Sequence, residues 1–231
     1  MADFTQTYIS RLETLDTTLL TPIVREALHD KSAVLLDWSQ QAIEGGFSGA
    51  PVYRFAGEAQ TAVGIQRWSA ILKIFVPPAN EQSVEDFAYW KREVLVYQSG
   101  LLSDLPAGLI APRCLAITEY PANEHWLWQE DMAVENKMPW SLEQYGIAAH
   151  HLGLFNGGYL TGQCLTGQSL PNHPWLRQSD IQQRLALAEP GIPQLPQLCA
   201  NPHFAGLIDE DQVRRIHHLW EQRQRLLTAL E

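Results

Sequence analysis

The sequence has little cysteine, few basic residues and no long apolar run. Its three cysteines, Cys114, Cys164 and Cys199, are far apart and form no Cys-x-x-Cys pair. Such a sparse, odd set argues against a disulfide framework, and we expect free, buried thiols in a reducing compartment. No stretch approaches the roughly 18 apolar residues of a membrane span, and the first residues lack the basic and apolar regions of a secretory signal. We therefore expect a cytoplasmic protein without a membrane partner.

Positive charge is also scarce. The chain has 16 Lys+Arg against 26 Asp+Glu, a net charge of −10, and no basic run. This balance argues against nucleic acid or an anionic membrane as a partner. It does not exclude a nucleotide, because one lysine and a few backbone amides are enough to bind phosphates. Apolar residues make up 45% of the 231 residues, which excludes intrinsic disorder and allows one or two domains.

The apolar pattern predicts helices first and strands next. Apolar residues at spacings of three and four indicate a helix near the amino terminus, and Pro22, with Thr21 as its cap, is expected to open a second one. From Val34 to Phe75 the pattern changes to short β-type runs. They predict a meander of strands with a glycine-rich turn between the first two.

A helix is expected after the meander. Ser83 and Asp86 form the pattern of a capping box, and Gly100 is a suitable end. The runs 114–120 and 125–132 then read as a hairpin joined by the short turn PANE. We expect one five-stranded antiparallel sheet with one packed helix.

The remainder of the chain reads as helical. Three capping boxes predict helix starts: Ser141 with Gln144, Ser179 with Gln182 and Asp209 with Gln212. The first of these helices is expected to end near Phe155 and the last to run to the end of the chain. The predicted organisation is amino-terminal helices over 1–32, a β-rich domain over 33–132 and a helical part over 133–231.

One set of residues suits nucleotide binding. A glycine-rich turn, with Gly45, Gly46 and Ser48, lets backbone amides approach phosphates. Lys73 on a nearby strand offers a point charge, and Glu93 on the helix can hold that lysine by pairing with it. Each piece has a simpler interpretation: a lysine on a solvent-facing strand edge, a glutamate on a solvated helix face and an ordinary hairpin turn. The order of the pieces along the chain favours the joint interpretation.

That order resembles the amino-terminal lobe of a protein-kinase-like fold. The stretches GGFSGAPVYRF, SAILKIF, FAYWKREVLVYQSGLL, HWLWQEDM and IAAHHLGLFNGGYL resemble the aminoglycoside phosphotransferase and choline-kinase group of small-molecule kinases. The resemblance implies an α+β fold in which a helical lobe follows the sheet. It implies that Lys73, paired with Glu93, contacts the phosphates of ATP or GTP bound with Mg²⁺. Backbone groups near Glu130 and Met132 would take the base, and a small, hydroxyl-bearing, cationic molecule would accept the phosphoryl group.

The sequence departs from that family at the catalytic loop. Such kinases need a His-x-Asp loop, and none of the eight histidines has an aspartate two positions later. We identify no catalytic and no metal-binding residue, and we interpret Asp209 as a helix cap. We expect the helical lobe to be incomplete, with the chain stopping short of the loop, and therefore inactive alone. The alternative is a non-catalytic, pseudokinase-type scaffold that binds a partner.

Other patterns are weaker. GFSGA lacks the second glycine of a nucleophile elbow. The adjacent pairs His150-His151 and His217-His218 point about 100° apart on a helix, which does not suit one metal ion. We expect the tryptophans of the β-rich part to be core residues, with a ring-stacking pocket as the alternative: Trp38, Trp68, Trp90, Trp126 and Trp128.

Overall fold

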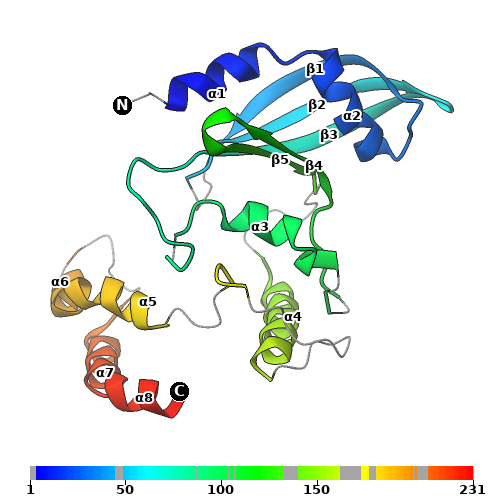
Figure 1. Cartoon of the computed structure of the whole chain (residues 1–231). Helices are drawn as coiled ribbons and strands as arrows, with labels where there is room; N and C mark the ends of the chain where they lie inside the picture. The colour runs from blue at the N-terminus through cyan, green and yellow to red at the C-terminus, as the bar shows by residue number, and fades with distance from the viewer. Residues whose placement is uncertain are drawn as a thin grey trace. The chain divides into compact units, whose positions relative to one another are not determined.

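The computed structural model describes most of the chain as two compact units, Met1–Leu176 and Arg177–Glu231. The described residues are 4–44, 49–86, 88–103, 105–106, 108–132, 140–161, 173–176, 181–199, 201 and 208–230. The fold combines helices with one antiparallel sheet (Figure 1), as the sequence predicts. Within the described residues, no helix is both long and apolar enough to cross a membrane.

The sheet of the first unit has five strands in the order β1-β2-β3-β5-β4. Its strands are β1 Val34–Ile43, β2 Val52–Thr61, β3 Gly64–Phe75, β4 Cys114–Tyr120 and β5 Glu124–Glu130. All neighbouring strands are antiparallel, and the predicted hairpin of β4 and β5 is joined by the short helix η2 Pro121–Asn123. The strand pairing confirms the predicted five-stranded antiparallel sheet.

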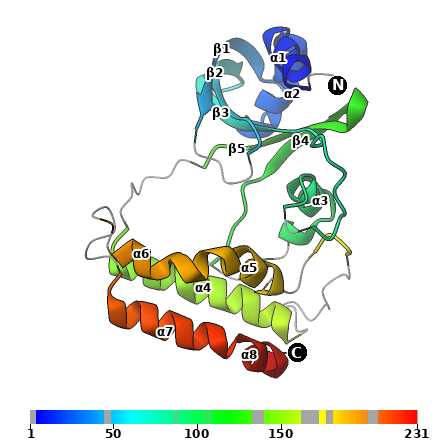
Figure 2. The ribbon, with the colours of Figure 1, turned by 90° about the vertical axis from the view of Figure 1, so that its left-hand side faces the viewer.

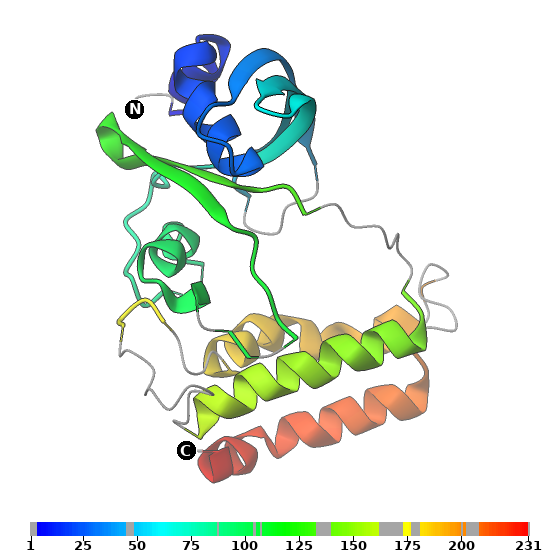
Figure 3. The ribbon, with the colours of Figure 1, turned by 90° about the vertical axis from the view of Figure 1, so that its right-hand side faces the viewer.

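Helices cover the two faces of the sheet unequally. The helices α1 Phe4–Glu13 and α2 Thr17–Leu28 lie on one side and α3 Arg92–Gln98 on the other (Figure 1, Figure 2 and Figure 3). The first face holds the main core, in which Leu20 and Val24 of α2 pack with Phe55, Leu72 and Trp126 of the sheet. Because side chains alternate along a strand, the residues between these core positions point to the face of α3.

Three of the tryptophans expected in the core are buried there: Trp68, Trp126 and Trp128. Trp38 and Trp90 are partly buried and pack at the edges of apolar clusters. Cys114, in contrast, is exposed. The expectation of buried thiols is wrong for this residue, since it opens the edge strand β4, where one side has no neighbouring strand.

The helix expected to open at Pro22 opens earlier. Asp16 has an extended backbone, and its side chain accepts a hydrogen bond of 3.0 Å from the amide of Leu19, so it is the cap of α2. Pro22 lies inside the helix, and the hydroxyl of Thr21 donates back to the carbonyl of Thr17. The predicted cap at Thr21 is therefore wrong, because the cap is the last extended residue before the helix, and that residue is Asp16.

The helix predicted from Ser83 is only a turn there. One contact of the capping box is present, from the amide of Ser83 to the Asp86 side chain (2.8 Å), whereas the Ser83 hydroxyl accepts from the amide of Glu85 (3.3 Å) rather than from that of Asp86. A continuing helix needs the carbonyl of Asp86 for the amide of Trp90. That carbonyl instead accepts from the amide of Tyr89 at 3.1 Å and from Arg92 at 2.6 Å, and the amide of Trp90 donates to the side chain of Gln82. As a result, α3 begins only at Arg92, and it ends as predicted before Gly100, which has a φ of 74°.

The first unit also contains η1 Leu101–Ser103 and α4 Leu142–Leu160. The predicted capping box of α4 is present, with Ser141 and Gln144 exchanging hydrogen bonds of 2.8 and 3.2 Å. The helix extends beyond the predicted end near Phe155. A glycine elsewhere in this unit marks a close approach of two strands: a Cβ added to Gly57 would lie 2.1 Å from the carbonyl oxygen of Asp37, beside an irregularity in β1.

The second unit is helical. It consists of α5 Ile181–Ala188, η3 Glu189–Gln194, α6 Leu195–Cys199, α7 Glu210–Glu221 and α8 Arg223–Leu230. Figure 2 shows α7 alongside α6. Asp209 and Gln212 form the predicted capping box, which confirms Asp209 as a helix cap. The last helix is interrupted at Gln222, where the following Arg223 donates to the carbonyl of Trp220. The predicted cap Ser179 lies outside the described residues.

Candidate functional site

Lys73 lies on the face of the sheet opposite the main core. Its neighbours Leu72 and Ile74 are fully buried, and the alternation along β3 turns Lys73 to the face of α3. The side chain is 29% exposed, so its ammonium group is within reach of a ligand. In the neighbouring strands, Val52 and Leu127 are level with it.

Glu93 comes to this lysine from the first turn of α3. Its Oε1 lies 2.6 Å from Nζ of Lys73 and 3.4 Å from Nε2 of the buried Gln129. A charge-assisted contact of this length fixes the position of the ammonium group more firmly than a neutral hydrogen bond. The structure thus brings together the two residues that the sequence pairs, and it adds Gln129, which the sequence analysis missed.

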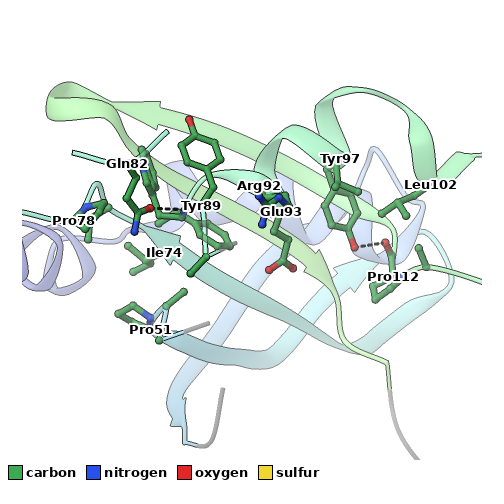
Figure 4. Close-up of a pocket in the computed structure, with 18 of the residues that line it drawn as sticks. Pro51, Ile74, Pro78, Gln82, Tyr89, Arg92, Glu93, Tyr97, Leu102 and Pro112 are labelled. Carbon is green, nitrogen blue, oxygen red and sulfur yellow. Dashed lines mark hydrogen bonds between the residues drawn. The ribbon is translucent and has the colours of Figure 1, made fainter. Parts of the chain in front are cut away.

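An apolar cluster holds α3 in place for this contact. Val94 is fully buried against Phe75 and Leu127 of the sheet. Burying such a side chain stabilises the packed state by about 1.5–3 kcal/mol. One turn further along, Tyr97 donates from its hydroxyl to the carbonyl of Pro112 at 3.1 Å, as Figure 4 shows. Burial, together with the negative charge of Glu93, raises the pKa of Tyr97 to about 12.

A second ion pair lies on the same face. In the register of the sheet, Arg54 of β2 is opposite Ile71 of β3, and Ile71 is opposite Gln129 of β5. The guanidinium of Arg54 contacts Asp131 through Nη2–Oδ1 at 3.0 Å and Nε–Oδ2 at 2.9 Å. Sequence analysis missed this pair because its members are 77 residues apart and no local pattern connects them.

The predicted glycine turn is only partly described. Gly45, Gly46 and Ser48 lie outside the described residues. The turn ends at Gly49, which has a φ of 69° and open space where a Cβ would be. Two residues later, the carbonyl of Pro51 accepts from the amide of Ile74 at 3.0 Å, so the end of this segment lies directly beside Lys73.

Glu130 and Met132, predicted to take the base, lie at the end of β5. The amide of Glu130 donates to the carbonyl of Arg113 at 2.9 Å, and its carboxylate lies 3.4 Å from the Arg113 guanidinium. That amide is therefore committed to the sheet and cannot bind a base at the same time. Met132 lies beyond the strand and is exposed.

The face between the two ion pairs is apolar and half-buried. Val52, Ala56 and Ile71 belong to it by the alternation along β2 and β3, and none of them is fully buried. A flat apolar surface bordered by a held ammonium group fits an aromatic base with an attached phosphate chain. A metal ion is not supported in the same way. Among the described residues, no cluster of three or more His, Cys, Asp or Glu side chains is arranged to bind one.

Comparison with known proteins adds no relative. No protein-family model, curated protein or solved structure matches the chain. The contact of Lys73 with Glu93, and the order along the chain of the elements that carry these two residues, are the observations that bear on function.

Proposed function

We propose that this chain is a nucleotide-binding protein of the aminoglycoside phosphotransferase and choline-kinase type. ATP or GTP would lie on the sheet face that carries Lys73. The observation that carries the proposal is the contact of 2.6 Å between Lys73 on β3 and Glu93 on α3. The resemblance stated for the sequence assigns this contact to the phosphate-binding lysine and its helix partner.

The order of the elements supports the proposal. A glycine turn, a strand, the lysine strand, the glutamate helix and a hairpin follow one another, as in the amino-terminal lobe of a protein-kinase-like fold. Lys73 and Glu93 lie on different elements, 20 residues apart in the sequence. If the two residues had unrelated roles, nothing would require their side chains to be in contact. Their contact therefore favours the joint interpretation over a solvent-facing lysine and a solvated glutamate.

Each residue has a defined task in this proposal. Lys73 donates from its ammonium group to phosphate oxygens, and Glu93 keeps that group in place between binding events. Gln129 donates to the same carboxylate oxygen and limits its rotation. Val52 and Ile71 offer the apolar surface for the base. The nucleotide itself, bound with Mg²⁺, would supply the phosphoryl group.

We expect binding by this chain without turnover. Phosphoryl transfer depends on a positioned acceptor and on charge neutralisation at the phosphates. The sequence contains no His-x-Asp loop to orient an acceptor hydroxyl. We therefore expect the chain by itself to hydrolyse ATP or GTP no faster than the spontaneous rate in buffer.

Titration with a fluorescent ATP analogue in the presence of Mg²⁺ tests the proposal. Lys73→Ala should weaken binding by about tenfold or more, which corresponds to at least about 1.4 kcal/mol. The matched control is Lys31→Ala, since Lys31 lies exposed in the turn between α2 and β1. Equal affinities of the two variants, in proteins with unchanged circular dichroism, would overturn the site. Absence of binding by the unmodified chain would favour the non-catalytic scaffold instead.

A further inference from the structure

A large cavity lies along α3, on the side of the helix that carries Glu93 (Figure 4). Its volume is about 1070 Å³, and it extends from the end of β3 to the segment that follows α3. Small-molecule sites commonly measure about 300–1,000 Å³. The cavity is therefore of the size that holds one small organic ligand.

The lining is almost entirely apolar. It includes Ile74 at the end of β3, Trp90 before α3, Val96 on α3 and Leu109 beyond it. Two residues of α4, Leu152 and Phe155, complete it. A lining of this kind favours an occupant that gains free energy mainly by leaving water.

The lining offers little to balance the charge of an anionic occupant. Of the described residues around the cavity, Arg92 carries the one positive charge and Glu93 the one negative charge. The guanidinium of Arg92 already donates to the carbonyls of Asp86 at 2.6 Å and Trp175 at 2.8 Å. These donors already bind backbone carbonyls, and Lys73 is not part of the lining. An anion buried here would therefore lose its hydration without gaining a paired donor.

Glu93 offers one hydrogen-bond acceptor to an occupant. Lys73 and Gln129 both contact its Oε1, and neither contacts Oε2. In Figure 4 the carboxylate points away from α3, into the space bordered by Pro51 and Ile74. An occupant with a single N–H or O–H group can donate to Oε2 without displacing Lys73.

We propose that this cavity is a second binding site, for a neutral and largely apolar small molecule with one hydrogen-bond donor. The site lies along α3, whereas the face proposed for the nucleotide lies on the sheet; Glu93 and the segment of Gly49 and Pro51 border both. The apolar body would fill the space between α3 and the end of β3, and the donor would contact Oε2 of Glu93. The proposal does not depend on nucleotide binding.

Two related dyes provide the test. N-phenyl-naphthylamine is neutral, apolar and carries one N–H, whereas anilinonaphthalene sulfonate adds an anionic group to the same rings. Titrated into the full chain without nucleotide, the neutral dye should bind saturably at one site per chain. The sulfonate should bind at least about tenfold more weakly, because burial of its charge in the apolar lining costs hydration that no paired donor replaces.

Variants that reduce the volume of the cavity distinguish binding of the dye in this site from binding to exposed apolar surface elsewhere. Val96→Trp should weaken binding of the neutral dye by about tenfold or more, and Val96→Phe by a smaller factor. The matched control is Val63→Trp, because Val63 lies in the β2–β3 turn and is 82% exposed. If Val96→Trp fails to fold, as judged by circular dichroism, Val96→Phe decides.

Three results would overturn the proposal. They are binding of the neutral dye that does not saturate, equal affinity for the sulfonate, and equal affinity of the Val96 and Val63 variants. The dye titrations are made without nucleotide, and the nucleotide titrations of Lys73→Ala are made without either dye. Failure of the cavity and failure of the nucleotide site are therefore recorded by different measurements.

Discussion

Arg54 and Asp131 form a two-contact ion pair that connects β2 with the segment after β5. The contacts measure 2.9 and 3.0 Å, and they cross β3, which lies between the two strands. The planar guanidinium matches the carboxylate, a geometry that lysine cannot reproduce. The pair therefore fixes the point at which the chain leaves the sheet, beside the face proposed for the nucleotide.

Removing this ion pair should have a small effect on stability. The Arg54 side chain is 46% exposed, so water screens much of the attraction. A double-mutant cycle with Arg54→Ala and Asp131→Ala, measured by urea unfolding, should give a coupling free energy of about 0.2–1 kcal/mol. The control cycle uses Arg67 and Glu58, which are 3.9 Å apart, and should give a coupling near zero. Equal coupling in the two cycles would contradict the assigned role.

Tyr97 should make the folded state less stable in strong alkali. Its pKa is about 12 in the folded chain, against about 10 for a free tyrosine. Because the pKa is raised in the folded state, the contribution of Tyr97 to the free energy of unfolding is complete below about pH 10. This contribution is lost as the pH rises through the folded-state pKa. Tyr97→Phe should reduce this alkaline loss relative to the unmodified chain, when the free energy of unfolding is compared from pH 9 to 12.

Tyr145→Phe is the control for that comparison, because Tyr145 is exposed on α4. It should leave the alkaline dependence unchanged. Tyr97→Phe also removes the hydrogen bond to Pro112, so at neutral pH it should lower the free energy of unfolding by about 1 kcal/mol.

His125 should reduce stability in mild acid. The side chain is fully buried, and desolvation together with the charge of Lys91 lowers the pKa of His125 below its ordinary 6.5. The unfolded chain therefore takes up a proton first, and stability falls as the pH drops below about 6.5. His125→Gln should flatten the dependence of the unfolding free energy on pH between about 7 and 5. The control His150→Gln, at an exposed position of α4, should leave this pH dependence unchanged. Flattening of the dependence by both variants would refute the explanation.

Two glycines should respond to alanine in opposite directions. Gly57→Ala would bring a methyl group to 2.1 Å from the backbone oxygen of Asp37, which β1 cannot move easily. We expect a loss of about 1–3 kcal/mol or more in the free energy of unfolding. Gly146→Ala, in the second turn of α4 where an added Cβ meets open space, should stabilise the helix by up to about 1 kcal/mol. Thermal unfolding of the two variants measures both effects, and a stabilising Gly57→Ala would show the strand approach to be looser.

Local signals in the sequence predicted the parts of the fold that depend on neighbouring residues. The capping boxes at Ser141 and Asp209 form as predicted, since each needs only the first turn of its own helix. The strand with Lys73 and the helix with Glu93 were likewise predicted from alternation and periodicity. Their contact was predicted from the order of elements, and the structure contains it.

Features that depend on distant residues were not predictable. The pattern at Ser83 closes a turn rather than a helix, since the amide of Trp90 donates to the side chain of Gln82 and Arg92 donates to the carbonyl of Asp86. Asp131 finds Arg54 across an intervening strand, and nothing near either residue signals the contact. In both cases an arginine side chain made contacts that the local pattern does not specify.

The contacts of Arg92 have a consequence for motion. One guanidinium connects the carbonyls of Asp86 and Trp175 to α3, whereas the described residues between β3 and α3 belong to no strand of the sheet. Segments with few backbone ladders open locally at a lower free energy than the core of a sheet. We expect amide hydrogens of α3 and of the turn before it to exchange together, earlier than those of β3 and β5. Each such opening also separates Glu93 from Lys73, and with it removes the group that holds the ammonium in place.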